Sequence, residues 1–189
     1  SDASLEAIIT IEIERCDDHE LKALSNELLS VLDDVELVVN DFQGVRKDLR
    51  ALIDDVRMLA PETSDRDECA EFLEWMDSGA FVFLGSNQFV LESEGEETFL
   101  TEIVDMRKGL LKRPGSETRK RRLTDLSSGV RSFYDTDKIL AFGKSSSRSS
   151  VHRSAYSHYV VVKRFDEAGN SIGEARFMGL HTSQFYGYS

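Results

Sequence analysis

The chain has 189 residues, of which 40% are hydrophobic and 31% are charged, and its formal net charge at pH 7 is −12. Such a composition is typical of a globular chain of one or two domains. No apolar run approaches the roughly 18 residues of a membrane-spanning helix, and the acidity argues against general nucleic-acid binding. Two cysteines without metal-ligand spacing favour a reducing compartment, so we expect a cytoplasmic protein.

The charge is distributed very unevenly along the chain. Residues 1–105 hold 28 acidic and 7 basic side chains, whereas residues 106–189 hold 7 acidic and 16 basic ones. The two halves therefore carry net charges of −21 and +9. They should attract each other, or attract copies of each other in an oligomer, until salt screens the interaction.

The first predicted element is a strand over residues 5–15. Ile9, Ile11 and Ile13 alternate with polar residues, which is the pattern of a half-buried strand. No partner strand lies upstream, and the chain begins with Ser1 rather than methionine. We therefore expect a piece of a longer protein, in which residues 1–16 complete a sheet that lies elsewhere.

A long amphipathic helix follows, from about residue 18 to residue 60, and Asp17 or Asp18 can cap its first turn. Its apolar residues are separated by alternating steps of three and four, with a mean period of 3.5: Leu21, Leu24, Leu28, Val31, Val35, Val38, Phe42, Val45, Leu49, Leu52, Val56 and Leu59. This period predicts packing along a near-parallel helical partner. At ~1.5 Å per residue the stripe is roughly 58 Å long. Either a second helix folds back on it, or it reaches other parts of a larger assembly. The alternative is two shorter helices with a bend near Asn40, Asp41 and Gly44.

Pro61 ends this helix, and a second helix is predicted over residues 65–78, ending at Ser78 and Gly79. Residues 17–79 thus form a helical connector. Because the apolar period changes to two from Ala80 onward, residues 80–189 predict a sheet-containing module.

This module begins with residues 81–92, which form one bent strand or a hairpin, and continues with a strand at 99–104. Short helical or irregular pieces over 105–111 and 125–133 flank a basic loop, and three strands from Ile139 onward close the module. The fold class is therefore α+β, with a five-stranded antiparallel sheet and flanking helices. This is the element order of PAS-like and GAF-like modules, and an ACT-like, ferredoxin-like module is the main rival.

The connection from Lys144 to Arg153 is the main candidate site, because ten residues hold one lysine, two arginines, one histidine and five serines. Such a segment is suited to gripping an anion or a carboxylate-bearing partner. The candidate contacts are Lys144, Ser147, Arg148, His152 and Arg153. Arg148 and Arg153 are the best bidentate donors, and His152 can add a pH-dependent contact. A solvated polar turn, or a bridge to acidic surface on the long helix or another subunit, are the alternatives.

Other chemistry is sparse. The basic run from Lys112 to Arg122 can touch phosphates, but Pro114 and Gly115 indicate a loop, and no aromatic residue interleaves the charges. The sequence has no GxSxG elbow, no GxGxxG or P-loop motif, and no histidine or cysteine pair at metal spacing. We therefore predict no catalytic, cofactor-binding or metal site in this chain.

Three tracts resemble the large-type bacterial NAD-specific glutamate dehydrogenases. They are Phe72–Trp75 followed by Phe81–Gly85, then Lys144–Arg153, and finally Val162–Asp166 with Gly173–Ser183. The long acidic helix also looks like the N-terminal region of that family. The resemblance covers nearly the whole chain in order.

The resemblance implies a fragment of the N-terminal regulatory half of such an enzyme, which is built of ACT-like and PAS-like modules. Residues 1–16 would be the last strand of a truncated ACT-like module, and residues 80–189 a PAS-like module. The parent would use NAD to deaminate L-glutamate to 2-oxoglutarate and ammonia. The expected partners are the remainder of the polypeptide, other subunits of a homo-oligomer, and a possible amino-acid or carboxylate effector, with no nucleic acid and no membrane. A stand-alone small-ligand sensor or a purely structural oligomerisation module is the alternative.

Overall fold

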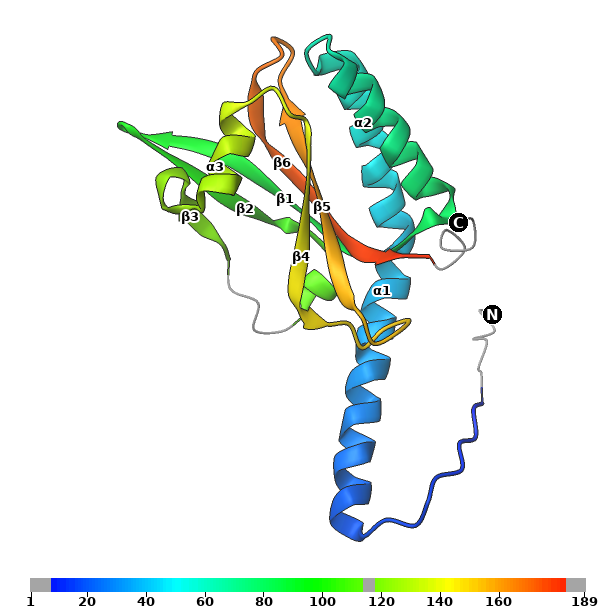
Figure 1. The fold of residues 1–189 in the computed structure, drawn as a ribbon. Helices are drawn as coiled ribbons and strands as arrows, with labels where there is room; N and C mark the ends of the chain where they lie inside the picture. Colours follow the sequence, from blue (N-terminus) through cyan, green and yellow to red (C-terminus); the bar gives the residue numbers. More distant parts are fainter. Residues whose placement is uncertain (1–7, 114–117, 183–189) are drawn as a thin grey trace, which may run out of the picture.

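The computed structural model describes residues 8–113 and 118–182 (Figure 1). The helices and strands, in chain order, are α1 (Asp18–Leu59), α2 (Ser64–Trp75), the π-helical turn η1 (Met76–Ala80), β1 (Phe81–Glu94), β2 (Glu97–Gly109), the 3₁₀ turn η2 (Leu110–Lys112), β3 (Lys120–Arg122), the 3₁₀ turn η3 (Leu123–Asp125), α3 (Ser128–Asp135), β4 (Leu140–Arg148), β5 (Tyr156–Phe165) and β6 (Ser171–His181).

The long helix is continuous. α1 has 42 residues, so the single-helix prediction is confirmed and the alternative of two shorter helices is wrong. Asp17 and Glu20 form a capping box at its start, in which each side chain accepts a hydrogen bond from the backbone N–H of the other residue. The helix ends at Ala60, because a residue that precedes a proline is pushed out of the helical region.

The sheet has six antiparallel strands in the order β3-β2-β1-β6-β5-β4. β1 and β2 form a hairpin, the chain then crosses through α3 to the far edge, and β4, β5 and β6 return in a meander to the centre. The α+β class is thus confirmed. The prediction of five strands is one too few, because Lys120–Arg122 pairs with the outer edge of β2.

Residues 81–92 lie in one strand, so the first of the two predicted alternatives is confirmed. One further expectation needs correction: β2 runs on to Gly109, so the helical piece expected over 105–111 is reduced to the short turn η2. The reason is a large bulge: the register steps from Gln88 opposite Ile103 to Ser86 opposite Lys108. The extra residues in β2 interrupt the period-two pattern that identifies a strand.

The C-terminal half of α1 and the whole of α2 cover one face of the sheet (Figure 1). The core between them includes Val45, Leu49, Leu52 and Val56 of α1, Cys69 and Leu73 of α2, and Phe81, Phe83, Val160, Val162 and Phe177 of the sheet. The helix therefore has a folded-back helical partner along this half.

The N-terminal half of α1 projects beyond the sheet, as the blue part of the helix in Figure 1 shows. Its apolar side chains Leu21, Leu28, Leu29, Leu32 and Val39 are exposed. The alternative of a second helix folding back is confirmed for the C-terminal half, and Val35 and Val38 pack against a second core cluster that includes Leu84 and Leu110. That the exposed part of the helix reaches other parts of a larger assembly stays a prediction.

The region before α1 is described from Ile8 onward. Residues 8–17 are in neither a helix nor a strand, and Ile8, Ile9, Ile11 and Ile13 are exposed. The remainder of the predicted strand, residues 5–7, lies outside the described residues. That this segment completes a sheet elsewhere stays a prediction.

Two leucines of α1 allow a matched test of this packing. Leu49→Ala should lower the free energy of unfolding by about 2–5 kcal/mol, because Leu49 has no exposed surface and its truncation leaves a cavity. Leu32→Ala on the same helix should change it by less than about 0.5 kcal/mol, because Leu32 is 61% exposed. Urea unfolding followed by circular dichroism measures both, and equal losses would contradict the packing described.

Candidate functional site

A row of aspartates on α1 meets the basic segment formed by the end of β2 and η2. Asp34, Asp41 and Asp48 are seven residues apart, so they lie on one side of the helix. They form ion pairs, in turn, with Arg113, Lys112 and Lys108. The acidic and basic halves of the chain thus attract each other within one molecule. The Gly109 N–H also donates to Asp41 at 2.7 Å, so the turn into η2 is held against the helix.

Asp34 also joins this row to the β4–β5 connection. It accepts hydrogen bonds from Arg113 Nε and Ser150 Oγ, both at 2.6 Å. Burial alone would raise the pKa of Asp34, but the bonds from Arg113 and Ser150 and the Arg113 charge outweigh it and lower the pKa. The predicted bridge between this connection and the long helix exists, and it is made by a serine rather than by an arginine.

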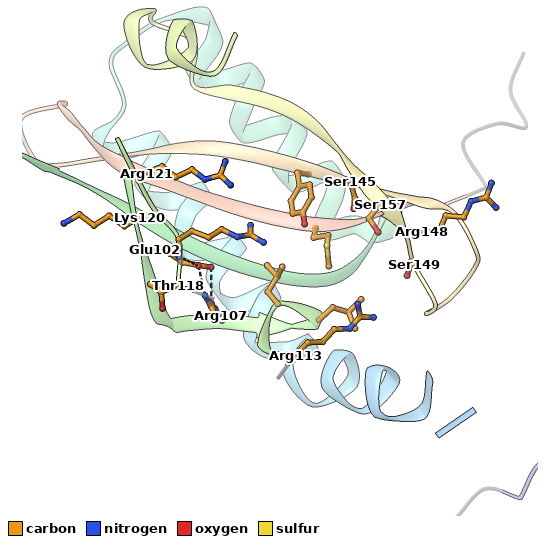
Figure 2. A pocket seen from close by; sticks show the side chains of 15 residues that line it. Glu102, Arg107, Arg113, Thr118, Lys120, Arg121, Ser145, Arg148, Ser149 and Ser157 are labelled. Carbon is orange, nitrogen blue, oxygen red and sulfur yellow. Dashed lines mark hydrogen bonds and ion pairs between the residues drawn. The ribbon is translucent and has the colours of Figure 1, made fainter. Parts of the chain in front are cut away.

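Beside this contact is a pocket of about 650 Å³. Its walls are the β2–β3 edge, η2 and the β4–β5 end of the sheet (Figure 2). The lining residues are Glu102, Arg107, Leu110, Leu111, Arg113, Thr118, Arg119, Lys120, Arg121, Ser145, Arg148, Ser149, Ser157, Tyr159 and Met178. Six of these side chains are cationic and one is acidic, although the chain as a whole is acidic.

The acidic residue, Glu102, is fully engaged. Its buried carboxylate accepts bonds from Asn87 Nδ2 at 2.6 Å, from Arg107 Nη2 at 2.7 Å and from the Arg119 N–H at 3.2 Å. Burial would raise the pKa of Glu102, but the bonds from Arg107, Asn87 and Arg119 lower it, so the carboxylate is ionised. This contact also holds the chain at the start of β3, and Figure 2 shows the Glu102–Arg107 pair at that end of the pocket.

The predicted contacts of the Lys144–Arg153 segment lie in different places. Lys144 and Arg148 belong to β4 rather than to a turn, and both lie over the Tyr156 ring, at 5.3 and 5.2 Å from its centre. Arg148 also lines the pocket. His152 is exposed and has a positive φ of 69°. The side chain of Ser147 lies outside the part of the structure that is described.

Arg153 does not join Arg148. Its Nη2 atom donates to the His181 carbonyl oxygen at 2.8 Å, at the end of β6. The structure instead brings Arg148 together with Arg119 and Arg121, which the sequence placed in a separate basic run. The spacing of two between Arg119 and Arg121 was the available signal, since it puts both side chains on one face of a strand.

A small histidine cluster lies near Arg153. The His181 ring centre is 5.2 Å from that of His158, 5.1 Å from Phe81 and 5.9 Å from Trp75. Burial lowers the pKa of His181, and the nearby His158 and Arg153 lower it further.

Other reactive groups offer little. Burial raises the pKa of the Cys69 thiol to about 12, so it is a core side chain rather than a nucleophile. Over residues 8–113 and 118–182, no group of three histidine, cysteine or acidic side chains is placed to hold a metal ion. In the same residues, no helix combines the length and the apolar character needed to cross a membrane.

Two curated proteins are similar to this chain, while no protein-family model matches it. An NAD-specific glutamate dehydrogenase of Halomonas elongata is 30% identical over 188 residues, which are 97% of this chain and 12% of that protein. The enzyme of the same name from Pseudomonas aeruginosa is 31% identical over 200 aligned positions, covering 100% of this chain and 12% of that protein. The chain thus spans about an eighth of these relatives, and the resemblance to this family is confirmed.

His181 gives a pH-dependent prediction. The folded chain favours neutral His181, whereas the unfolded chain binds a proton near the ordinary pKa of 6.5. The free energy of unfolding should therefore fall as the pH drops from about 7.5 to about 5.5. His181→Gln should flatten this slope, and His152→Gln, at an exposed position, should leave it unchanged. Urea unfolding at each pH measures the slope. An undiminished slope in His181→Gln would contradict the assignment.

Proposed function

We propose that this chain is a non-catalytic N-terminal segment, with a regulatory or assembly role, of an NAD-dependent glutamate dehydrogenase. The parent enzyme would be cytoplasmic and would oxidatively deaminate L-glutamate to 2-oxoglutarate and ammonia, with NAD bound outside this segment. The observation that carries the proposal is coverage: the similarity takes in 97–100% of this chain but 12% of each relative. Most of the relatives' length, where catalysis can reside, therefore lies beyond the matched segment.

The order of elements supports a division into modules. A hairpin, a crossover with a helix, and a three-stranded meander over residues 80–189 follow the PAS-like order rather than the alternating order of an ACT-like module. Residues 17–79 are the helical connector in this proposal. In the parent protein, residues 1–16 would become the last strand of a preceding ACT-like module, whose other strands would cover the exposed isoleucines.

The uncovered half of α1 supports the assembly role. Leu21, Leu28, Leu32 and Val39 are separated by seven, four and seven residues, so they share one face of the helix. All four are exposed. An apolar helix face of this length is suited to a partner helix. We place there the remainder of the same polypeptide and other subunits of a homo-oligomer.

The assembly role predicts a change of mass in the full-length protein. The double substitution Leu28→Glu and Leu32→Glu should shift its mass in light scattering toward smaller oligomers, because two buried charges would oppose packing of this helix face. Met58→Glu is the control, since Met58 is 71% exposed at the other end of α1. An unchanged oligomer in the double variant would remove this role from α1.

The non-catalytic role is tested on the 189-residue chain by itself. With NAD and L-glutamate it should form no NADH, because no catalytic or cofactor-binding group is assigned to it. The product of the complete gene should form NADH under the same conditions. Turnover by the 189-residue chain, or a complete gene product that forms none, would contradict the proposal.

A further inference from the structure

We propose that the pocket lined by Arg119, Arg121 and Arg148 binds a small organic anion with at least two negative charges, of the di- or tricarboxylate or phosphate-ester class. This inference deepens the regulatory function proposed above. It rests on that function only in making the anion an effector, since binding itself is measured without dehydrogenase activity.

The pocket is assembled from two basic segments that are distant in the sequence. Arg119 and Arg121 come from the β3 edge, whereas Arg148 comes from the end of β4. Figure 2 shows β3 with Arg121 at one end of the pocket and Ser145, Ser149 and Arg148 toward the other. In this view the side chain of Arg121 extends toward the middle of the pocket, whereas that of Arg148 extends away from it.

The alternation of β3 separates its basic side chains into two sets. One set, Lys120 and Arg122, lies against the Phe99 ring and pairs with Glu94 and Glu97. The other set is Arg119 and Arg121, whose side chains form no ion pair with a carboxylate among the described residues. Glu94 and Glu97 of the β1–β2 hairpin thus pair with Lys120 and Arg122. Among the described residues, no carboxylate pairs with Arg119 or Arg121.

Arg148 differs from these two residues. Its guanidinium group lies over the Tyr156 ring, 5.2 Å from the ring centre, and Tyr156 is not among the residues that line the pocket. Glu102 cannot serve these arginines, because its oxygens already accept bonds from Asn87, Arg107 and the Arg119 N–H. Arg119 and Arg121 thus have no carboxylate partner among the described residues, and an anion with several oxygens would supply one through bidentate hydrogen bonds.

The remaining walls favour an organic ligand of limited size. The hydroxyl residues Ser145, Ser149 and Ser157 line one side, and Leu111, Tyr159 and Met178 provide apolar surface. The volume of about 650 Å³ is within the ordinary range of small-molecule sites. A nucleic acid is disfavoured, because its phosphates would approach a chain with a net charge of −12.

Calorimetric titration of the 189-residue chain tests the proposal. Pyrophosphate and citrate are the probes, with acetate as the singly charged control, in about 0.15 M NaCl to screen weak surface attraction. We expect one-to-one, saturable binding of pyrophosphate, citrate or both, and none of acetate. Binding of pyrophosphate alone identifies phosphate esters as the ligands, and binding of citrate alone identifies polycarboxylates.

Variants locate the binding. Arg119→Ala with Arg121→Ala removes both unpaired cations at the β3 edge of the pocket and should weaken binding about tenfold or more. Arg15→Ala with Arg131→Ala removes the same charge from exposed positions outside the pocket and should leave binding unchanged. Unchanged thermal unfolding of each variant confirms that it is folded.

Three results would overturn the proposal. These are no saturable binding of either probe, equal weakening in both double variants, and tighter binding of a short DNA duplex through the same arginines. The first two leave the proposed dehydrogenase parentage intact, because that parentage is tested by NADH formation in the complete gene product. Conversely, a gene product without dehydrogenase activity would not alter the binding result.

Discussion

The row of ion pairs between α1 and the segment after β2 is the contact on which the arrangement of this molecule depends. Asp34, Asp41 and Asp48 tie the helix to the end of β2 and hold η2 and the β4–β5 connection against it. Each pair is partly exposed, so by itself it contributes no more than about 1 kcal/mol. These contacts fix the position of the helix. The apolar side chains in the C-terminal half of α1 pack on the sheet in the register that the three ion pairs and the Gly109 hydrogen bond also require. The opposite charges of the two halves of the sequence are therefore used within the fold.

Regular patterns in the sequence predicted the elements they describe. The period of 3.5 identified α1 over its full length, and the three C-terminal strands were identified by their alternation of apolar and polar residues. The pattern failed where strand geometry is irregular. The bulge in β2 hides its last residues from a period-two search, and β3 is three basic residues that carry no apolar signal.

The candidate site was predicted only in part, for a reason of geometry. Charge density singled out Arg148, which lines a pocket, but the density of charge along the chain does not show in which direction each side chain points. Arg153, five residues later, reaches the end of β6 instead. Arg119 and Arg121 line the same pocket as Arg148. Only the pairing of β3 with β2 and the meander of β4, β5 and β6 bring these positions to one pocket. The spacing of the aspartates on α1 is visible in the sequence. The sequence does not show that Lys108, Lys112 and Arg113 pair with them, because these residues are brought to the helix by the fold of the sheet.

One short segment of the chain contacts both α1 and the pocket. The stretch from Lys108 to Arg113 is tied to the aspartates of α1, and it also supplies Leu110, Leu111 and Arg113 to the pocket wall. The projecting half of α1 belongs to the same unbroken helix. The proposed assembly surface and the pocket are therefore connected by one continuous helix and by the segment that is paired with it.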